Sequence, residues 1–173
     1  GADLDSASKA RLSEINQRLS TLSEEFGRTL MESTRKLAVE LTEQELEGLP
    51  EERKASASAD AKALGREGFV IPLELPTVQS EQARLVQPEA RAKLYEASAR
   101  RGEGNAEGLI EAVQLRAERA ELLGFASHAD YVISEETAGN AQAARDMLFQ
   151  LAPAAEANAE GKQKLFAEAA SLR

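Results

Sequence analysis

The stretch LRAERAELLGFASHADY, residues Leu115–Tyr131, does most to decide the fold of this chain. Its first half places apolar residues at helical spacing among charged ones, which predicts the end of an amphipathic helix. Gly124 is then a typical helix stop, and Ser127 is a favoured first residue for a new helix. The stretch therefore predicts two helices joined by a tight corner.

Helical spacing also dominates the rest of the chain. Large apolar residues recur at steps of three and four near the start, which predicts one long helix from a cap at Asp5 or Ser6 to about Leu37. Its apolar stripe consists of Leu12, Ile15, Leu19, Leu22, Phe26 and Leu30. Glycine, proline and capping residues predict further helices over residues 50–64, 88–101, 105–123, 127–131 and from 140 onward. We expect residues 79–87, which are mostly polar, to form a loop.

One short segment alternates between faces in the manner of a strand. Apolar residues at every second position from Phe69 predict a strand up to Leu75, and Val39–Leu41 is its expected partner. Pro72 lacks an N–H donor, so this strand should lie at an edge. Between the two segments, Thr42 and Glu45 have the spacing of a capping box. The predicted fold class is mainly α, an elongated multi-helix array with one small two-stranded β ribbon.

Composition excludes several classes of function. The formal net charge is −9, whereas binding to nucleic acid needs a concentrated cationic surface. There is no cysteine, so disulfides and thiolate metal sites are excluded. No apolar run approaches the ~20 residues that cross a bilayer. We therefore expect no nucleic-acid or membrane partner. Composition does not decide the compartment, and our expectation is the cytoplasm, with the periplasm as the alternative.

His128 is the single histidine and the first candidate for chemistry. A zinc site needs three or four ligands, and Asp130, the nearest carboxylate, does not share a helix face with His128 at a spacing of two. No serine beyond its own neighbour, Ser127, is an evident partner for it, so the sequence does not indicate a nucleophile–base pair. We interpret His128 as a packed or capping residue, and Phe125 and Tyr131 as a packing contact across the glycine stop.

Other charged or glycine-rich patterns also favour structural interpretations. The run Gly102–Gly108 lacks the spacing of a dinucleotide-binding loop, and we expect a flexible connection there. Helix-end arginines such as Arg100 and Arg101 usually complement the helix dipole. Adjacent carboxylates point in different directions on a helix, so the following pairs should be solvated: Glu24–Glu25, Glu51–Glu52 and Glu135–Glu136. The sequence predicts no catalytic, cofactor-binding or metal-binding residue.

Several motifs, taken in order, resemble the M3 family of zinc metallopeptidases, which includes oligopeptidases and peptidyl-dipeptidases. The segment LLGFASHA, residues 122–129, is similar to the family pattern L-L-G-F-x-x-H-A. Four earlier segments resemble family elements in the same order: Leu4–Gly27, Leu46–Pro50 with the sequence LEGLP, Gly68–Pro76 with the sequence GFVIPLELP, and Arg91–Ala97 with the sequence RAKLYEA. The resemblance covers almost the whole chain.

The resemblance implies a nearly all-helical peptidase whose two lobes flank a channel for short peptides. M3 enzymes bind zinc through a His-Glu-x-x-His helix and a further glutamate, and this chain with its single histidine has no such motif. We therefore expect zinc only in the full-length parent enzyme and none in this chain. The chain alone would not be an enzyme, and residues 1–173 would be one helical segment of the channel wall.

Three interpretations remain open from the sequence. The first is a non-catalytic fragment whose partners are the rest of the parent chain and, in the parent, short peptides. The second is a free-standing helical module that binds another protein, and the third is a paralogue that lost its zinc and serves as an inhibitor or scaffold. The chain opens Gly-Ala-Asp and is still helical in pattern near Arg173, so we expect it to be part of a longer protein.

Overall fold

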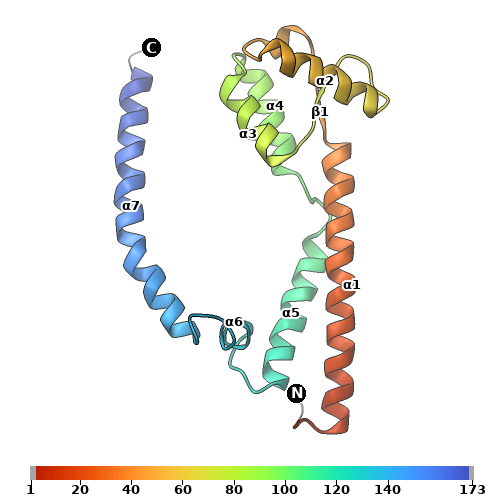
Figure 1. Cartoon of the computed structure of the whole chain (residues 1–173), viewed down its shortest axis with the longest axis vertical. Coiled ribbons are helices and arrows are strands. Elements are labelled where there is room, and N and C mark those ends of the chain that lie inside the picture. Colours follow the sequence, from red (N-terminus) through yellow and green to blue (C-terminus); the bar gives the residue numbers. More distant parts are fainter. Residues whose placement is uncertain (1–2, 172–173) are drawn as a thin grey trace. The chain divides into compact units, whose positions relative to one another are not determined.

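The computed structural model describes residues 3–171 of the chain, and these are mainly helical (Figure 1). The elements are α1 (Ser6–Lys36), β1 (Val39–Leu41), η1 (Gln44–Leu46), α2 (Glu51–Ala63), β2 (Phe69–Ile71), α3 (Leu75–Arg84), α4 (Pro88–Ala99), α5 (Ala106–Leu122), α6 (His128–Ile133) and α7 (Ala141–Ser171). Helices with one small two-stranded sheet confirm the predicted mainly-α class.

The chain divides into two compact units, which are described separately. Unit 2 runs from Asn16 to Val113, and unit 1 combines the residues up to Ile15 with those from Gln114 on. Helices α1 and α5 each contribute to both units. Across the described residues, no helix is both long enough and apolar enough to cross a membrane.

The β ribbon of unit 2 pairs the two predicted segments. Strands β1 and β2 are antiparallel, with Val39 opposite Ile71 and Leu41 opposite Phe69. The pairing confirms the predicted ribbon, but β2 ends at Ile71 rather than at Leu75. Pro72 follows directly, and because it has no N–H to donate to the ladder, the strand stops there. Leu73 is nevertheless fully buried, so the chain stays against the core after the strand ends.

The predicted loop over residues 79–87 is wrong. Most of that segment belongs to helix α3, which has Pro76 in its first turn and ends at Arg84. Proline is well placed there because the first amides of a helix need no intrahelical partner. Val78, Glu81 and Leu85 lie on the buried side at helical spacing. The charged residue in the middle of that pattern hid the helix from a count of apolar residues.

The core of unit 2 lies between the ribbon and helices α2 to α4. It consists of small and branched aliphatic side chains with no aromatic ring among its buried members: Val39, Leu41, Leu46, Leu49, Ala57, Ile71, Leu73, Val78, Leu85, Ala90 and Leu94. Alanines allow the helices to approach closely, while leucine fills the remaining space. Aromatic residues make up only 4% of the chain, which accords with a core filled by leucine.

Caps fix the ends of several helices as predicted. The carboxylate of Asp5 accepts a hydrogen bond from the amide of Ser8 at 2.8 Å at the start of α1. Thr42 and Glu45 form the capping box, since each side chain accepts a bond from the other's amide. Asn140 accepts from the amide of Ala143 at 2.8 Å at the start of α7. Local sequence therefore sets these boundaries independently of the core.

Helix α7 of unit 1 has almost no core of its own. None of its described side chains is buried. Its large apolar residues are all more than half exposed: Met147, Leu148, Phe149, Leu151, Leu165 and Phe166. The helix continues through Pro153. Such a helix gains little free energy from packing within this chain.

Candidate functional site

The corner between α5 and α6 has the geometry that its sequence predicts. Gly124 has a φ of +81°, a region that costs other residues more than glycine. The amide of Phe125 donates to the carbonyl of Ala120 at 2.9 Å, and that of Gly124 to the carbonyl of Glu121 at 2.9 Å. These two bonds define a Schellman motif, which ends α5. Two residues on, Ser127 Oγ accepts from the amide of Asp130 at 3.1 Å and starts α6.

His128 is half-buried behind this corner. Burial, followed by the positive charges of Arg116 and Arg119, lowers the pKa of His128 below its ordinary value, so the ring is neutral at pH 7. Its Nδ1 atom is buried and has no hydrogen-bond partner among the described residues. The positive charges of the two arginines disfavour a metal cation at this ring for the same reason that they disfavour its protonation.

The rings around His128 pack against each other. Phe125 and Tyr131 meet edge to face with their centroids 5.4 Å apart, the contact expected across the glycine stop. The guanidinium of Arg119 lies over the Tyr131 ring at 5.3 Å. The hydroxyl of Ser127 donates to the carboxylate of Asp130 at 2.6 Å, so this serine is engaged within its own cap and not with the histidine. The arrangement holds a helix corner together.

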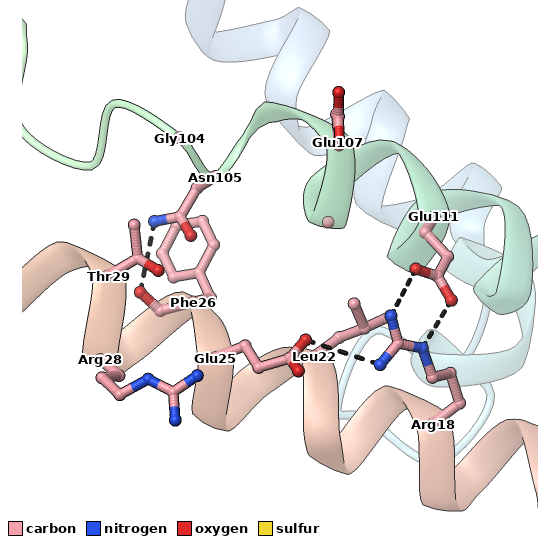
Figure 2. Close-up of a pocket in the computed structure, with 11 residues that line it drawn as sticks. Arg18, Leu22, Glu25, Phe26, Arg28, Thr29, Gly104, Asn105, Glu107 and Glu111 are labelled. Atoms are coloured by element: carbon pink, nitrogen blue, oxygen red, sulfur yellow. Dashed lines mark hydrogen bonds and ion pairs between the residues drawn. The ribbon is translucent and has the colours of Figure 1, made fainter.

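The second candidate region is the run Gly102–Gly108, which faces α1 within unit 2 (Figure 2). Its first four residues form a turn, and α5 begins at Ala106. Gly102 and Gly104 adopt positive φ values, and the amide of Gly102 donates to Ser33 Oγ at 2.8 Å. The side-chain amide of Asn105 donates to the carbonyl of Phe26 at 3.2 Å. The predicted flexible connection is therefore tied to α1 at two points.

A cavity of about 340 Å³ lies between this loop, the start of α5 and α1 (Figure 2). Its charged lining is mixed: Arg18, Glu25, Arg28, Glu107 and Glu111. Arg18 is already neutralised by two bonds to the carboxylate of Glu111, at 2.6 and 2.7 Å, and lies 3.5 Å from Glu25. With three carboxylates against two arginines, one of which is already paired, the cavity does not favour a phosphate.

Two bidentate ion pairs join α1 to α5, one in each unit. Arg18 binds Glu111 in unit 2, and Arg11 binds Glu118 in unit 1 through bonds of 2.6 and 2.8 Å. The hydrogen bonds from these arginines lower the pKa of each glutamate. Both pairs are solvent-exposed, so they fix the register of the helices more than they stabilise the fold.

The other charged groups singled out from the sequence have structural partners or face solvent. Arg100 pairs with Glu103 at 2.8 Å, and Arg101 donates to the carbonyl of Leu73 at 3.0 Å. Glu51 pairs with Lys54 at 2.7 Å. Among the described residues, no group of three histidines, aspartates or glutamates is placed to hold a metal ion. The sequence prediction that the chain carries no site residues remains a prediction.

A buried ion pair in unit 2 was missed by the sequence analysis. Arg53 Nε of α2 donates to Glu81 Oε1 of α3 at 2.5 Å, and Arg53 also lies 3.4 Å from Asp60. The Glu81 side chain is 2% exposed and that of Arg53 is 20% exposed. The pair joins two helices of the core. Its signal in the sequence is an acid at the buried position of the spacing Val78–Glu81–Leu85.

An apolar groove lies between α6 and α7 in unit 1. We call it the α6–α7 groove and define it by Ala129, Ile133, Ala144, Leu148, Phe149 and Ala152. Its volume is about 450 Å³. Arg145 is the one charged residue in its lining, and its guanidinium lies 6.0 Å from the centre of the Phe149 ring. The groove offers shape and apolar surface, but no group that could perform acid–base chemistry.

Comparison with known proteins places these features in a family. The model of peptidase family M3 matches residues 82–172, more than half of the chain. Oligopeptidase A of Salmonella typhimurium is 29% identical over 170 residues, which cover 92% of this chain and 25% of that protein. Dipeptidyl carboxypeptidase of Escherichia coli is 30% identical over 166 residues, with coverages of 92% and 24%.

Dipeptidyl carboxypeptidase of Salmonella typhimurium is 32% identical over 162 residues, which cover 90% of this chain and 24% of that protein. The chain thus spans about a quarter of the length of the curated relatives that it matches. Helix α7, the α6–α7 groove and the corner at Gly124 all fall within the residues that match the family model. The resemblance inferred from the motif at that corner is confirmed, and the chain belongs to peptidase family M3.

Proposed function

We propose that this chain is a non-catalytic part of a zinc-dependent M3 peptidase that hydrolyses short peptides, and that it helps to shape the substrate channel. One observation carries the proposal. The chain aligns over 92% of its length with peptidases, yet covers only a quarter of them. In this proposal residues 1–173 are one segment of a larger wall, and the partners of that segment are the rest of the peptidase and, within it, short peptides.

The donor groups of this chain do not fit a zinc ion. Its single histidine has a lowered pKa between two arginines, and the carboxylate of Asp130 accepts a bond from Ser127. Zinc held by the His-Glu-x-x-His helix of the family would polarise the water that attacks the peptide bond. We therefore assign the zinc ligands and the general base to the part of the peptidase outside this chain.

The compact core and the contacts between helices suit a segment of a channel wall. Unit 2 has a compact core, and helix α1 is braced against α5 by the Arg18–Glu111 pair. Rigid helical walls restrict a channel to unfolded chains, because a folded domain cannot enter. The proposal covers both oligopeptidase and dipeptidyl carboxypeptidase activity, since relatives of both kinds match at 29 to 32% identity. It places the enzyme in the cytoplasm, with the periplasm as the alternative.

The reading frame beyond the Arg173 codon tests the proposal. The expected result is a His-Glu-x-x-His motif and a later glutamate in the same frame. A stop codon directly after Arg173 would overturn the proposal and favour the alternative of a free-standing helical module, for which the uncovered apolar residues of α7 would be the binding surface. A long downstream sequence without the motif would instead favour a paralogue that lost its zinc.

A further inference from the structure

The lining of the α6–α7 groove combines small residues with large exposed ones. Ala144 and Ala152 are partly buried, whereas Leu148 and Phe149 are 62% and 65% exposed. Small residues let a second helix approach closely, and large ones then pack against its sides. The geometry of the groove therefore suits a helix rather than a small molecule.

The apolar surface continues along α7 beyond the groove. Leu151 and Phe166 fall on the same side of the helix as Leu148, at steps of three and eighteen residues, and both are more than half exposed. Full burial of one such side chain contributes roughly 1.5–3 kcal/mol. Large apolar side chains that are exposed on one side of a helix mark a contact surface.

The charge at the edge of the groove indicates the chemistry of its occupant. Arg145 stacks near Phe149, and among the residues that the structure describes it has no carboxylate partner. An arginine at the rim of an apolar contact gains most from a carboxylate, which its planar donors can bind in pairs. The occupant should therefore be an apolar helix that carries an acidic residue opposite Arg145.

We infer that the α6–α7 groove holds such a helix from the same polypeptide, supplied by the part of the peptidase outside residues 1–173. This inference rests on the proposed function. Two findings support this occupant. The relatives have about three quarters of their length outside the aligned region, and the groove lies within the residues that match the family model.

A photo-crosslinker identifies the occupant directly. p-Benzoylphenylalanine is placed at Leu148 in the whole gene product, and the crosslinked peptides are identified by mass spectrometry. The expected crosslink joins Leu148 to an apolar helix of the same molecule, outside residues 1–173. A crosslink to a second copy or to another protein overturns the inference, and so does the absence of any crosslink to protein.

Thiol labelling provides the matched second measurement, since residues 1–173 contain no cysteine. Ala152→Cys lies in the groove, and Ala157→Cys lies on the same helix but about 140° further around it. In the whole gene product, labelling of Ala152→Cys should be about tenfold slower than in the chain 1–173 alone. The rate at Ala157→Cys should slow less than that at Ala152→Cys. Equal rates at Ala152→Cys in the two proteins would contradict the inference.

Hydrolysis of a short fluorogenic peptide is measured on the same whole gene product. A protected groove in an inactive protein would leave the docking inference standing and remove the proposed function. An active peptidase with a freely labelled groove would remove the docking inference alone. The two proposals therefore fail in different ways.

Discussion

Two helical regions of this chain use the same residue types to opposite effect. Around the β ribbon, helices α2 and α4 bury Ala57, Ala90 and Leu94 completely, each at 0% exposed. Helix α7 is also rich in alanine and leucine, yet its Leu148 is 62% exposed. A leucine contributes to stability only where another surface covers it. The first region is stabilised by contacts within the chain, whereas the second gains little from such contacts.

Replacing one leucine by alanine in each region tests this difference with the largest expected effect. Leu94→Ala should lower the free energy of unfolding of the chain by about 2–5 kcal/mol, because it leaves a cavity in a closed core. Leu148→Ala should change it by less than about 0.5 kcal/mol. Urea denaturation followed by circular dichroism measures both. Equal losses would mean that α7 packs within the isolated chain.

The buried ion pair tests how the core joins α2 to α3. Arg53→Met leaves the Glu81 carboxylate buried without its main partner and should cost about 3 kcal/mol. Lys54→Met is the control, because Lys54 pairs with an exposed Glu51, and the substitution should cost under about 0.5 kcal/mol. Combining Arg53→Met with Glu81→Leu should recover most of the loss. No recovery in the denaturation midpoint would show that packing of the arginine, and not its charge, holds the helices.

Two glycine substitutions test the backbone conformation at two positions. Gly124→Ala puts a side chain at a φ of +81° and should destabilise the corner by about 1–2 kcal/mol. Gly27→Ala, within α1, meets no atom within 4 Å and should stabilise the chain by up to about 1 kcal/mol. Thermal unfolding of both variants gives the two signs. A stabilising Gly124→Ala would disprove the left-handed corner.

The smallest expected effect concerns His128 and pH. Burial and the two nearby arginines lower its pKa in the folded chain, so the unfolded chain takes up the proton first as the pH falls through about 6.5. The folded state should therefore lose stability as the pH falls from about 6.5 toward the lower pKa of the folded chain. Well above about pH 6.5, His128 should not lower the stability. His128→Gln should remove this part of the pH dependence. Unfolding free energies of both proteins between about pH 8 and pH 5 measure the difference, and parallel curves would contradict the prediction.

Local signals in the sequence were sufficient for most of the fold. The alternation after Gly68 predicted the ribbon, and the capping residues Asp5, Ser127 and Asn140 predicted helix starts that the structure confirms. The signal failed at α3, where Glu81 occupies a core position. A charged residue in a core interrupts the pattern of apolar residues. Its partner, Arg53, is 28 residues away in the sequence, so no local pattern indicates the ion pair.

The contacts between α1 and α5 could not be predicted from local patterns, since their partners are about ninety or more residues apart. A weak signal does exist. Arg11 and Arg18 are seven residues apart, as are Glu111 and Glu118, and seven residues return to the same face of a helix. Opposite charges with equal spacing on two helices indicate an antiparallel pair. The cavity beside the Gly102–Gly108 loop follows from that pairing and has no sequence pattern of its own.

In the proposed function, this chain shapes a peptidase but performs none of its chemistry. The most direct test measures bound zinc and hydrolysis of a short fluorogenic peptide for the chain 1–173 and for the whole gene product, side by side. The account predicts one zinc ion and hydrolysis for the whole product only, with neither for the chain alone. Stoichiometric zinc together with hydrolysis that copurifies with residues 1–173 would contradict it.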